Sequence, residues 1–154
     1  MKKTILILVL LFAFPLVLVS CSFSKGDPAE DFKYSLNGDT ITIFGYTGNK
    51  TEVVIPEKIE GKRVTLIGAE AFMGNDLITS ITIPKGNDTK GEAAFFIGDK
   101  AFWGCNMLKT VNFPKGFVKF YGKEVFFRCS MLSEETKQRI LEMDSDQKID
   151  FLGN

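Results

Sequence analysis

The feature that most constrains the fold of this chain is a string of residues that recurs three times. IGAEAFMGNDLITSITIP at 67–84 aligns without gaps on IGDKAFWGCNMLKTVNFP at 97–114, and YGKEVFFRCSML at 121–132 continues the pattern. The strings begin at 67, 97 and 121, so their offsets are 30 and then 24 residues. Self-similarity at such intervals predicts a solenoid, in which each unit covers the apolar face of the next.

Short strands that end at a proline accompany the strings: VVIP at 53–56, ITIP at 81–84 and VNFP at 111–114. Proline stops a hydrogen-bond ladder, and alternation along a strand sends neighbouring side chains to opposite faces. We expect the inward side chains to be Val53, Ile55, Ile81, Ile83, Val111 and Phe113. We expect the outward side chains to be Val54, Thr82 and Asn112, extended by Glu52, Ser80 and Thr110 two positions earlier.

Two other columns of the repeat have a mechanical interpretation. Aromatic residues at one position of each string are expected to stack as a spine: Phe72, Phe102 and Phe126. Glycines recur where the chain turns a corner: Gly68, Gly98 and Gly122. Glycine at a corner is consistent with a positive φ or with close approach of two backbone segments, so alanine is not expected to fit all three positions.

The string I-G-x-x-A-F-x-x-C-x-x-L, followed by an I-x-I-P strand, resembles the treponemal-type (BspA-like) leucine-rich repeats of bacterial surface proteins. The resemblance covers about residues 40–132, with departures at Asn75, Tyr121 and Val125, and the third string lacks its strand. It implies an α+β fold, a short leucine-rich-repeat solenoid of about three rungs. It also implies a binding role of the kind that relatives suggest for attachment to host matrix.

Both ends of such an array need caps, because an open solenoid exposes apolar residues and strand edges. At the start, the segment 32–44 flanks Asn37-Gly38, a strong hairpin signal, and predicts a β cap. At the end, Ser133 is an expected N-cap, with two glutamates in the first turn and Ile140 on an apolar face. These features predict an N-terminal β-hairpin cap and a C-terminal helix cap.

The first twenty residues carry the pattern of a signal peptide. Lys2 and Lys3 precede an apolar run from Ile5 to Val19, which is shorter than the roughly 20 residues that a spanning helix needs. LVSC at 18–21 resembles the lipobox of bacterial lipoproteins, which implies cleavage before Cys21 and lipid attachment to its thiol. The alternative is ordinary cleavage near Ser20, which would leave a free thiol.

The chain of 154 residues is long enough for one domain with a real core. We therefore expect a lipoprotein signal peptide at 1–20, a lipidated cysteine and flexible tether at 21–31, an N-terminal β cap at 32–52, leucine-rich repeats at 53–132, and a capping helix and tail at 133–154.

Composition excludes several functions. Cleavage would remove Lys2 and Lys3, leaving 17 basic and 19 acidic side chains, and this balance argues against a nucleic-acid partner. The chain contains no histidine, which removes the usual general base and the commonest metal ligand. We expect no catalytic residue, no cofactor and no metal site, because two neighbouring cysteines supply too few ligands for zinc.

Cys105 and Cys129 occupy the same position in adjacent units. Stacked strands would bring their Cα atoms within disulfide range, and an envelope location would permit oxidation. The alternative, which we favour, is a pair of buried thiols, because side chains that point the same way rarely reach the torsion of a disulfide.

Two apolar columns and one insertion are candidates for a binding surface. The columns comprise Leu66, Phe96 and Phe120 before each corner glycine, and Met73, Trp103 and Phe127 after each spine phenylalanine. The alternative is that these side chains pack as further core. The segment KGNDTKGEAA at 85–94 bulges from the middle unit and is a second candidate, although a tolerated surface loop is the alternative that we favour.

The predicted protein is an envelope lipoprotein, held on a membrane by lipid at Cys21, that binds a protein ligand. Its expected binding residues are Leu66, Thr82, Phe96, Trp103, Asn112 and Phe120. A structural lipoprotein that docks to other envelope components is an open alternative, and an enzyme is a weaker one. The sequence also leaves open whether the protein lies in the outer membrane or on the cell surface.

Overall fold

The computed structural model describes residues 26–85, 95–114, 118–144 and 149–151. No helix within these ranges is long and apolar enough to cross a membrane. The elements, in chain order, are a short 3-10 helix η1 (Ala29–Asp31), the strands β1 (Phe32–Asn37), β2 (Thr40–Tyr46), β3 (Glu52–Val54), β4 (Lys58–Ile59), β5 (Lys62–Ile67), β6 (Ser80–Thr82), β7 (Phe95–Ile97), β8 (Thr110–Asn112) and β9 (Val118–Phe120), and the helix α1 (Glu134–Met143).

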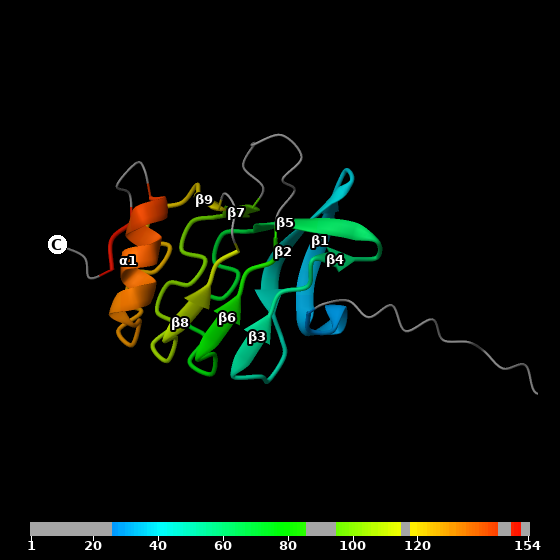
Figure 1. The fold of residues 1–154 in the computed structure, drawn as a ribbon. Helices are drawn as coiled ribbons and strands as arrows, with labels where there is room; N and C mark the ends of the chain where they lie inside the picture. Colours follow the sequence, from blue (N-terminus) through cyan, green and yellow to red (C-terminus); the bar gives the residue numbers. More distant parts are fainter. Residues whose placement is uncertain (1–25, 86–94, 115–117, 145–148, 152–154) are drawn as a thin grey trace, which may run out of the picture.

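The strands form two sheets between which the chain winds. Sheet A has the order β1-β2-β5-β7-β9, with β4 paired to β5, and sheet B has the order β3-β6-β8. The strands β2, β5, β7 and β9 are parallel to one another, as are β3, β6 and β8. Figure 1 shows β1 at one end of the array and α1 at the other end, beside β8. The chain thus forms a short solenoid, and most of its turns contribute one strand to each sheet.

Sheet B consists of the strands that the sequence predicted, and sheet A adds strands that it did not. Val53, Ile81 and Val111 lie opposite one another in sheet B, so the predicted register is present. The strands β5, β7 and β9 of sheet A lead into the corner glycines. The strands β7 and β9 have only three residues each, and burial along β5 does not alternate, which is why alternation did not identify them.

The predicted N-terminal hairpin is confirmed. β1 and β2 pair antiparallel up to Asn37 and Thr40, and Gly38 in the turn has a φ of 60°. A positive φ favours glycine, and Asn-Gly turns suit a two-residue hairpin. β2 also pairs in parallel with β5, so the hairpin provides the first parallel strand of sheet A as well as its end.

The predicted tether at 21–31 is described only from Gly26 onward, and these last residues belong to the fold. The Asp27 backbone N–H donates to the carbonyl of Val54 (2.7 Å), and the Val54 N–H donates to Asp27 Oδ2 (2.8 Å). Lys50 Nζ lies 2.5 Å from Asp27 Oδ1, and Asp27 is buried. These bonds close the outer edge of β3 with the segment that precedes β1.

The core between the sheets contains a stack of aromatic rings. The centroids of Phe72 and Phe102 are 5.2 Å apart, and those of Phe102 and Phe126 are also 5.2 Å apart with rings inclined by 3°. Inward strand residues fill the remaining space, although Phe113 is only half-buried and meets Phe120 edge-on. Apolar burial of this kind is the main force that holds the units together.

The corner glycines are required by close backbone approach. None of them is among the residues with a positive φ. A Cβ atom added at Gly98 would lie 2.9 Å from the backbone nitrogen of Ala69, and one added at Gly122 would overlap the backbone of Asp99. The structure therefore decides between the two roles that the sequence left open for these positions.

Candidate functional site

The outward side chains of sheet B form a continuous surface, here called the sheet B face. Its members pair across the strands as Glu52–Ser80–Thr110 and Val54–Thr82–Asn112. Asn112 Nδ2 donates to Ser80 Oγ (3.4 Å) and to Thr82 Oγ1 (3.2 Å), so neighbouring strands are linked on this surface. The structure thus brings together Thr82 and Asn112, two of the predicted binding residues.

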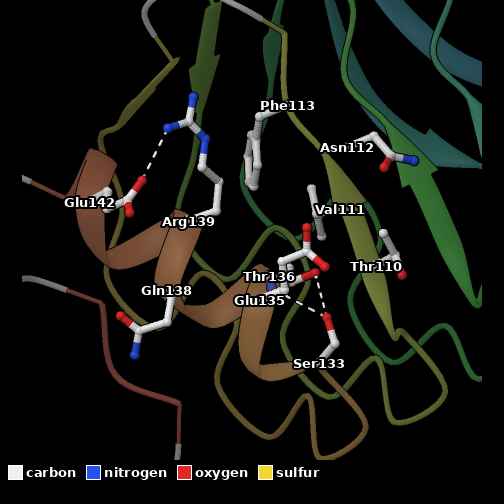
Figure 2. Close-up of a pocket in the computed structure, with 10 residues that line it drawn as sticks. All are labelled: Thr110, Val111, Asn112, Phe113, Ser133, Glu135, Thr136, Gln138, Arg139 and Glu142. Atoms are coloured by element: carbon white, nitrogen blue, oxygen red, sulfur yellow. Dashed lines mark hydrogen bonds and ion pairs between the residues drawn. The ribbon is translucent and has the colours of Figure 1, made fainter.

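A groove of about 580 Å³ adjoins this face between β8 and α1, and we call it the β8–α1 groove. Figure 2 shows the ten residues that line it, with the strand on one side and the helix on the other. They are Thr110, Val111, Asn112, Phe113, Ser133, Glu135, Thr136, Gln138, Arg139 and Glu142.

A second hollow, of about 200 Å³, lies at the carboxyl ends of the sheet B strands. Its lining includes Val54, Thr82, Pro84 and Pro114. Asn112 and Phe113 line both hollows, so the two adjoin across the end of β8. A ligand of extended shape could therefore contact the face and the helix together.

The helix wall of the groove follows from local sequence. Ser133 Oγ accepts a hydrogen bond from the Thr136 N–H (3.2 Å), which is the predicted N-cap. Thr136 and Ile140 are buried, and the adjacent side of the helix, which carries Glu135, Gln138, Arg139 and Glu142, lines the groove. The sequence predicted this helix only as a cap. The polar side chains on its groove side were the signal that the helix also forms part of a surface.

The helix wall is acidic in balance. Arg139 Nη1 forms an ion pair with Glu142 Oε2 (3.1 Å) one turn along the helix. In the part of the chain that the structure describes, no cation pairs with Glu135. Figure 2 shows the Glu135 side chain on the groove side of the helix, near β8. The groove thus offers one carboxylate to a cationic group.

The first apolar column, which comprises Leu66, Phe96 and Phe120, lies on sheet A, apart from the sheet B face. The predicted exposure is wrong for one of these residues, Phe120. Leu66 and Phe96 pair across β5 and β7 and are half-buried. Phe120 pairs with Ile97, and it is only 5% exposed. Phe120 therefore takes the inward position of the repeat and is a core residue, unsuited to the binding role that we assigned to it.

The cause of this error is a single extra residue in the third unit. Ile97 precedes the spine residue Phe102 by five positions, whereas Phe120 precedes Phe126 by six. Tyr121 is the additional residue: it is 65% exposed and packs on Phe96 with centroids 4.9 Å apart. The ungapped alignment treated Tyr121 as a replacement for the repeat isoleucine and so shifted this column by one.

The second apolar column gathers around Trp103. Its ring is half-buried, stacks on Phe127 at 6.2 Å, and lies 5.4 Å from the guanidinium carbon of Arg128. Met73, in the preceding unit, is exposed. Arg128 has a φ of 61° at the position where the earlier units have Gly74 and Gly104, and sequence analysis did not select it. Trp103 is therefore partly accessible, but it lines neither hollow beside the sheet B face.

The two candidate disulfide cysteines are free and buried. The Cys105 thiol donates to the carbonyl of Phe72 (3.0 Å), and the Cys129 thiol donates to the carbonyl of Phe102 (3.0 Å). The hydrogen bond with Cys129 and burial raise the pKa of the Cys105 thiol. The disulfide alternative is thus not formed, and these contacts are those of packed thiols.

Three other predictions fall on residues outside the described ranges. The predicted signal peptide at 1–20 and the predicted lipidation site, Cys21, precede the first described residue. The inserted segment 85–94 is described only at Lys85, which is exposed. Within the described residues, no group of three or more histidine, cysteine, aspartate or glutamate side chains is arranged to hold a metal ion.

Comparison with known proteins identifies the repeat family to which this fold belongs. The family model of the BspA type Leucine rich repeat region matches residues 39–143 in 6 copies. A solved leucine rich cell surface protein from Faecalibacterium prausnitzii A2-165 is 30% identical, with a TM-score of 0.57 over 70% of this chain and 29% of that one. This chain therefore spans less than a third of that relative. No curated protein matches closely enough to bear on function.

A second solved structure matches over almost its whole length. A leucine-rich repeat protein from Bacteroides capillosus ATCC 29799 is 19% identical, with a TM-score of 0.57 over 84% of this chain and 99% of that one. At this identity the likeness concerns the fold alone. Together with the family model, it confirms the predicted α+β leucine-rich-repeat architecture.

Proposed function

Because the chain belongs to the BspA type leucine-rich repeat region family, we propose that it is a non-catalytic, protein-binding module of the bacterial cell envelope. The relative from Faecalibacterium prausnitzii is described as a cell surface protein, which supports an envelope location. Leucine-rich repeats stack into rigid surfaces, and a rigid surface loses less conformational entropy when it binds.

The observation that carries this proposal is the continuity of the sheet B face with two hollows. Six outward side chains lie in one parallel register, and the residues at the end of β8 line both hollows. A standard protein interface buries roughly 800 Å² on each partner, so the face needs the groove to reach that size. The ligand therefore contacts both sheet B and α1.

The proposed anchor is lipid on Cys21, supported by the lipobox-like string at 18–21. The first described residues lie against β3, where Asp27 bonds Val54, and the β8–α1 groove lies at the far end of sheet B. An anchor close to β3 would leave this groove away from the bilayer. Each buried acyl CH₂ contributes about 0.8 kcal/mol, so several chains would hold the domain stably.

Affinity capture from envelope and host-matrix extracts tests the binding face. We expect a partner held by the wild-type chain to be lost by a Thr82→Arg, Asn112→Arg double variant, because two long cations would cover the face. The matched control is Ser35→Arg with Thr42→Arg, which adds the same charge on β1 and β2 of sheet A. Equal capture by both double variants, at unchanged melting temperature, would contradict this placement.

A separate experiment tests the anchor. Cells grown with a palmitate analogue should label the wild-type protein and leave a Cys21→Ser variant unlabelled. Persistent label on the variant would exclude Cys21 as the lipid site. Protease treatment of intact cells then distinguishes display at the surface, where the domain is cut, from an assembly role inside the envelope, where it is protected.

A further inference from the structure

The two edges of sheet B differ in how their backbone groups are satisfied. In a parallel ladder, alternate residues direct their N–H and C=O groups to opposite neighbours. In β8, the carbonyl of Asn112 accepts from the Ile83 N–H (2.9 Å), and the Thr110 N–H donates to the carbonyl of Thr79 (3.2 Å). The N–H and C=O of Val111 therefore point to the other side, away from β6.

That other side is the β8–α1 groove. The carbonyl of Lys109, two residues before Val111, accepts from the Ser133 N–H (3.0 Å) at the start of the helix. Val111 also lines the groove. Among the described residues, no hydrogen-bond partner is found for the N–H or the C=O of Val111. β8 thus presents an edge with free backbone groups to the groove.

The edge is free because the third unit departs from the path of the earlier ones. The same bond recurs at the start of each sheet B segment: Thr79 N–H donates to Thr51, Lys109 N–H to Thr79, and Ser133 N–H to Lys109. After Thr79 and Lys109 the chain continues as β6 and β8. After Ser133 it forms α1, so a fourth strand of sheet B is missing beside β8.

We propose that an extended peptide segment of the protein partner, carrying a lysine or arginine, adds to sheet B along the free edge of β8. This inference rests on the proposed protein-binding function and specifies how the partner is held. Main-chain hydrogen bonds to Val111 supply the pairing, as in other cases of strand addition. The free carboxylate of Glu135 on the helix wall selects a cationic side chain.

The dimensions and the charges of the groove fit this occupant. Its volume of about 580 Å³ lies within the usual range for ligand sites. Val111 is only 5% exposed, and it lines the groove together with the exposed side chains of Glu135 and Arg139. These flexible side chains change rotamer as the peptide strand binds. Arg139 is already paired with Glu142, which leaves the helix wall with a net negative charge.

Amide spectroscopy on the full chain tests the inference directly. The probes are two synthetic peptides of alternating valine and threonine, one carrying lysines and the other glutamates at the same positions. We expect the lysine peptide to shift the Val111 amide resonance and slow its hydrogen exchange. Glu135→Arg should weaken this binding roughly tenfold, the size expected for the loss of one charged contact. Glu134→Arg, with the same charge change one residue earlier, should have little effect.

A second variant acts on the backbone itself. Val111→Pro removes the free N–H while the bonds from Thr110 and Asn112 to β6 remain, and proline is tolerated on edge strands for this reason. We expect it to abolish binding of the lysine peptide. If this variant fails to fold, the wild-type amide measurement and the Glu134→Arg and Glu135→Arg pair still decide the question.

The outcomes separate this inference from the proposed function. No change at the Val111 amide with the lysine peptide overturns strand addition, and so does equal binding of the two peptides. Protection of Val111 by a self-association of the chain, without peptide, assigns the edge to a second copy and also overturns it. In each case, loss of the captured partner through Thr82→Arg and Asn112→Arg would leave the proposed function standing.

Discussion

The two edges of sheet B end the same sheet in different ways. At β3, a buried aspartate at position 27 accepts from the Val54 N–H and donates its own N–H to the Val54 carbonyl. At β8, the helix α1 bonds only the carbonyl of Lys109 and then leaves the strand. One edge is thus closed by backbone and carboxylate bonds, and the other is covered at its start and open along its length.

The difference indicates that covering the apolar core and satisfying the backbone groups of a strand edge are separate requirements. α1 buries Ile140 and Thr136 against the last unit, which removes apolar surface from water. It does not satisfy the backbone of Val111, because a helix has no free N–H groups along its side. A solenoid that ends in a helix therefore keeps a strand edge, which proteins usually protect by other means.

The largest expected effect comes from loosening the helix at the open end. Ile140→Ala should lower the free energy of unfolding by about 3 kcal/mol, because the side chain is 0% exposed and its loss leaves a cavity. Urea denaturation measures this change. Leu141→Ala is the control, since Leu141 is 47% exposed and should cost much less. Equal losses would mean that α1 does not close the core.

The next effect contrasts the two ends of the glycine column. Gly122→Ala should cost about 2–3 kcal/mol, because its Cβ would overlap the backbone of Asp99 and one segment must move. At Gly68, near the other end, the added Cβ would lie 3.2 Å from the nearest atom, the Ile43 carbonyl oxygen. Gly68→Ala should therefore be milder in the same denaturation assay. The reverse order would contradict the close approach at Gly122.

A smaller loss follows from opening the closed edge. Asp27→Ala should destabilise the fold by about 2 kcal/mol, since it leaves the Val54 N–H without its partner. Hydrogen exchange of the Val54 amide should accelerate at the same time. Lys50→Met keeps the carboxylate and should cost less, because its ammonium group is partly exposed. If Val54 stayed protected in Asp27→Ala, the aspartate would not be what closes this edge.

The smallest effect concerns the strained residue near the open end. Arg128→Gly should be more stable than Arg128→Ala by about 1 kcal/mol, because both lose the contacts with Trp103 and only glycine adopts a φ of 61° without strain. Thermal unfolding of the two variants, side by side, measures the difference. A less stable glycine variant would show that the backbone there is not strained.

The sequence predicted much of this fold and only part of the site. It located the sheet B strands, the hairpin at Asn37 and the helix after Ser133 from local alternation, turn and capping signals. It selected Thr82 and Asn112 correctly as neighbours on one face. It missed the groove, because the two walls, β8 and α1, are separate in sequence and only tertiary packing sets them side by side.

The sequence by itself determined the period of the repeat, the inward and outward sides of sheet B and the nature of both ends. These properties depend on residues close together in the chain, whose preferences are visible one segment at a time. Only the tertiary structure decided that Phe120 lies inside while Tyr121 lies outside, and that the edge at Val111 is free. Those outcomes depend on register between units far apart in sequence, and one extra residue is enough to change which side chain faces the core.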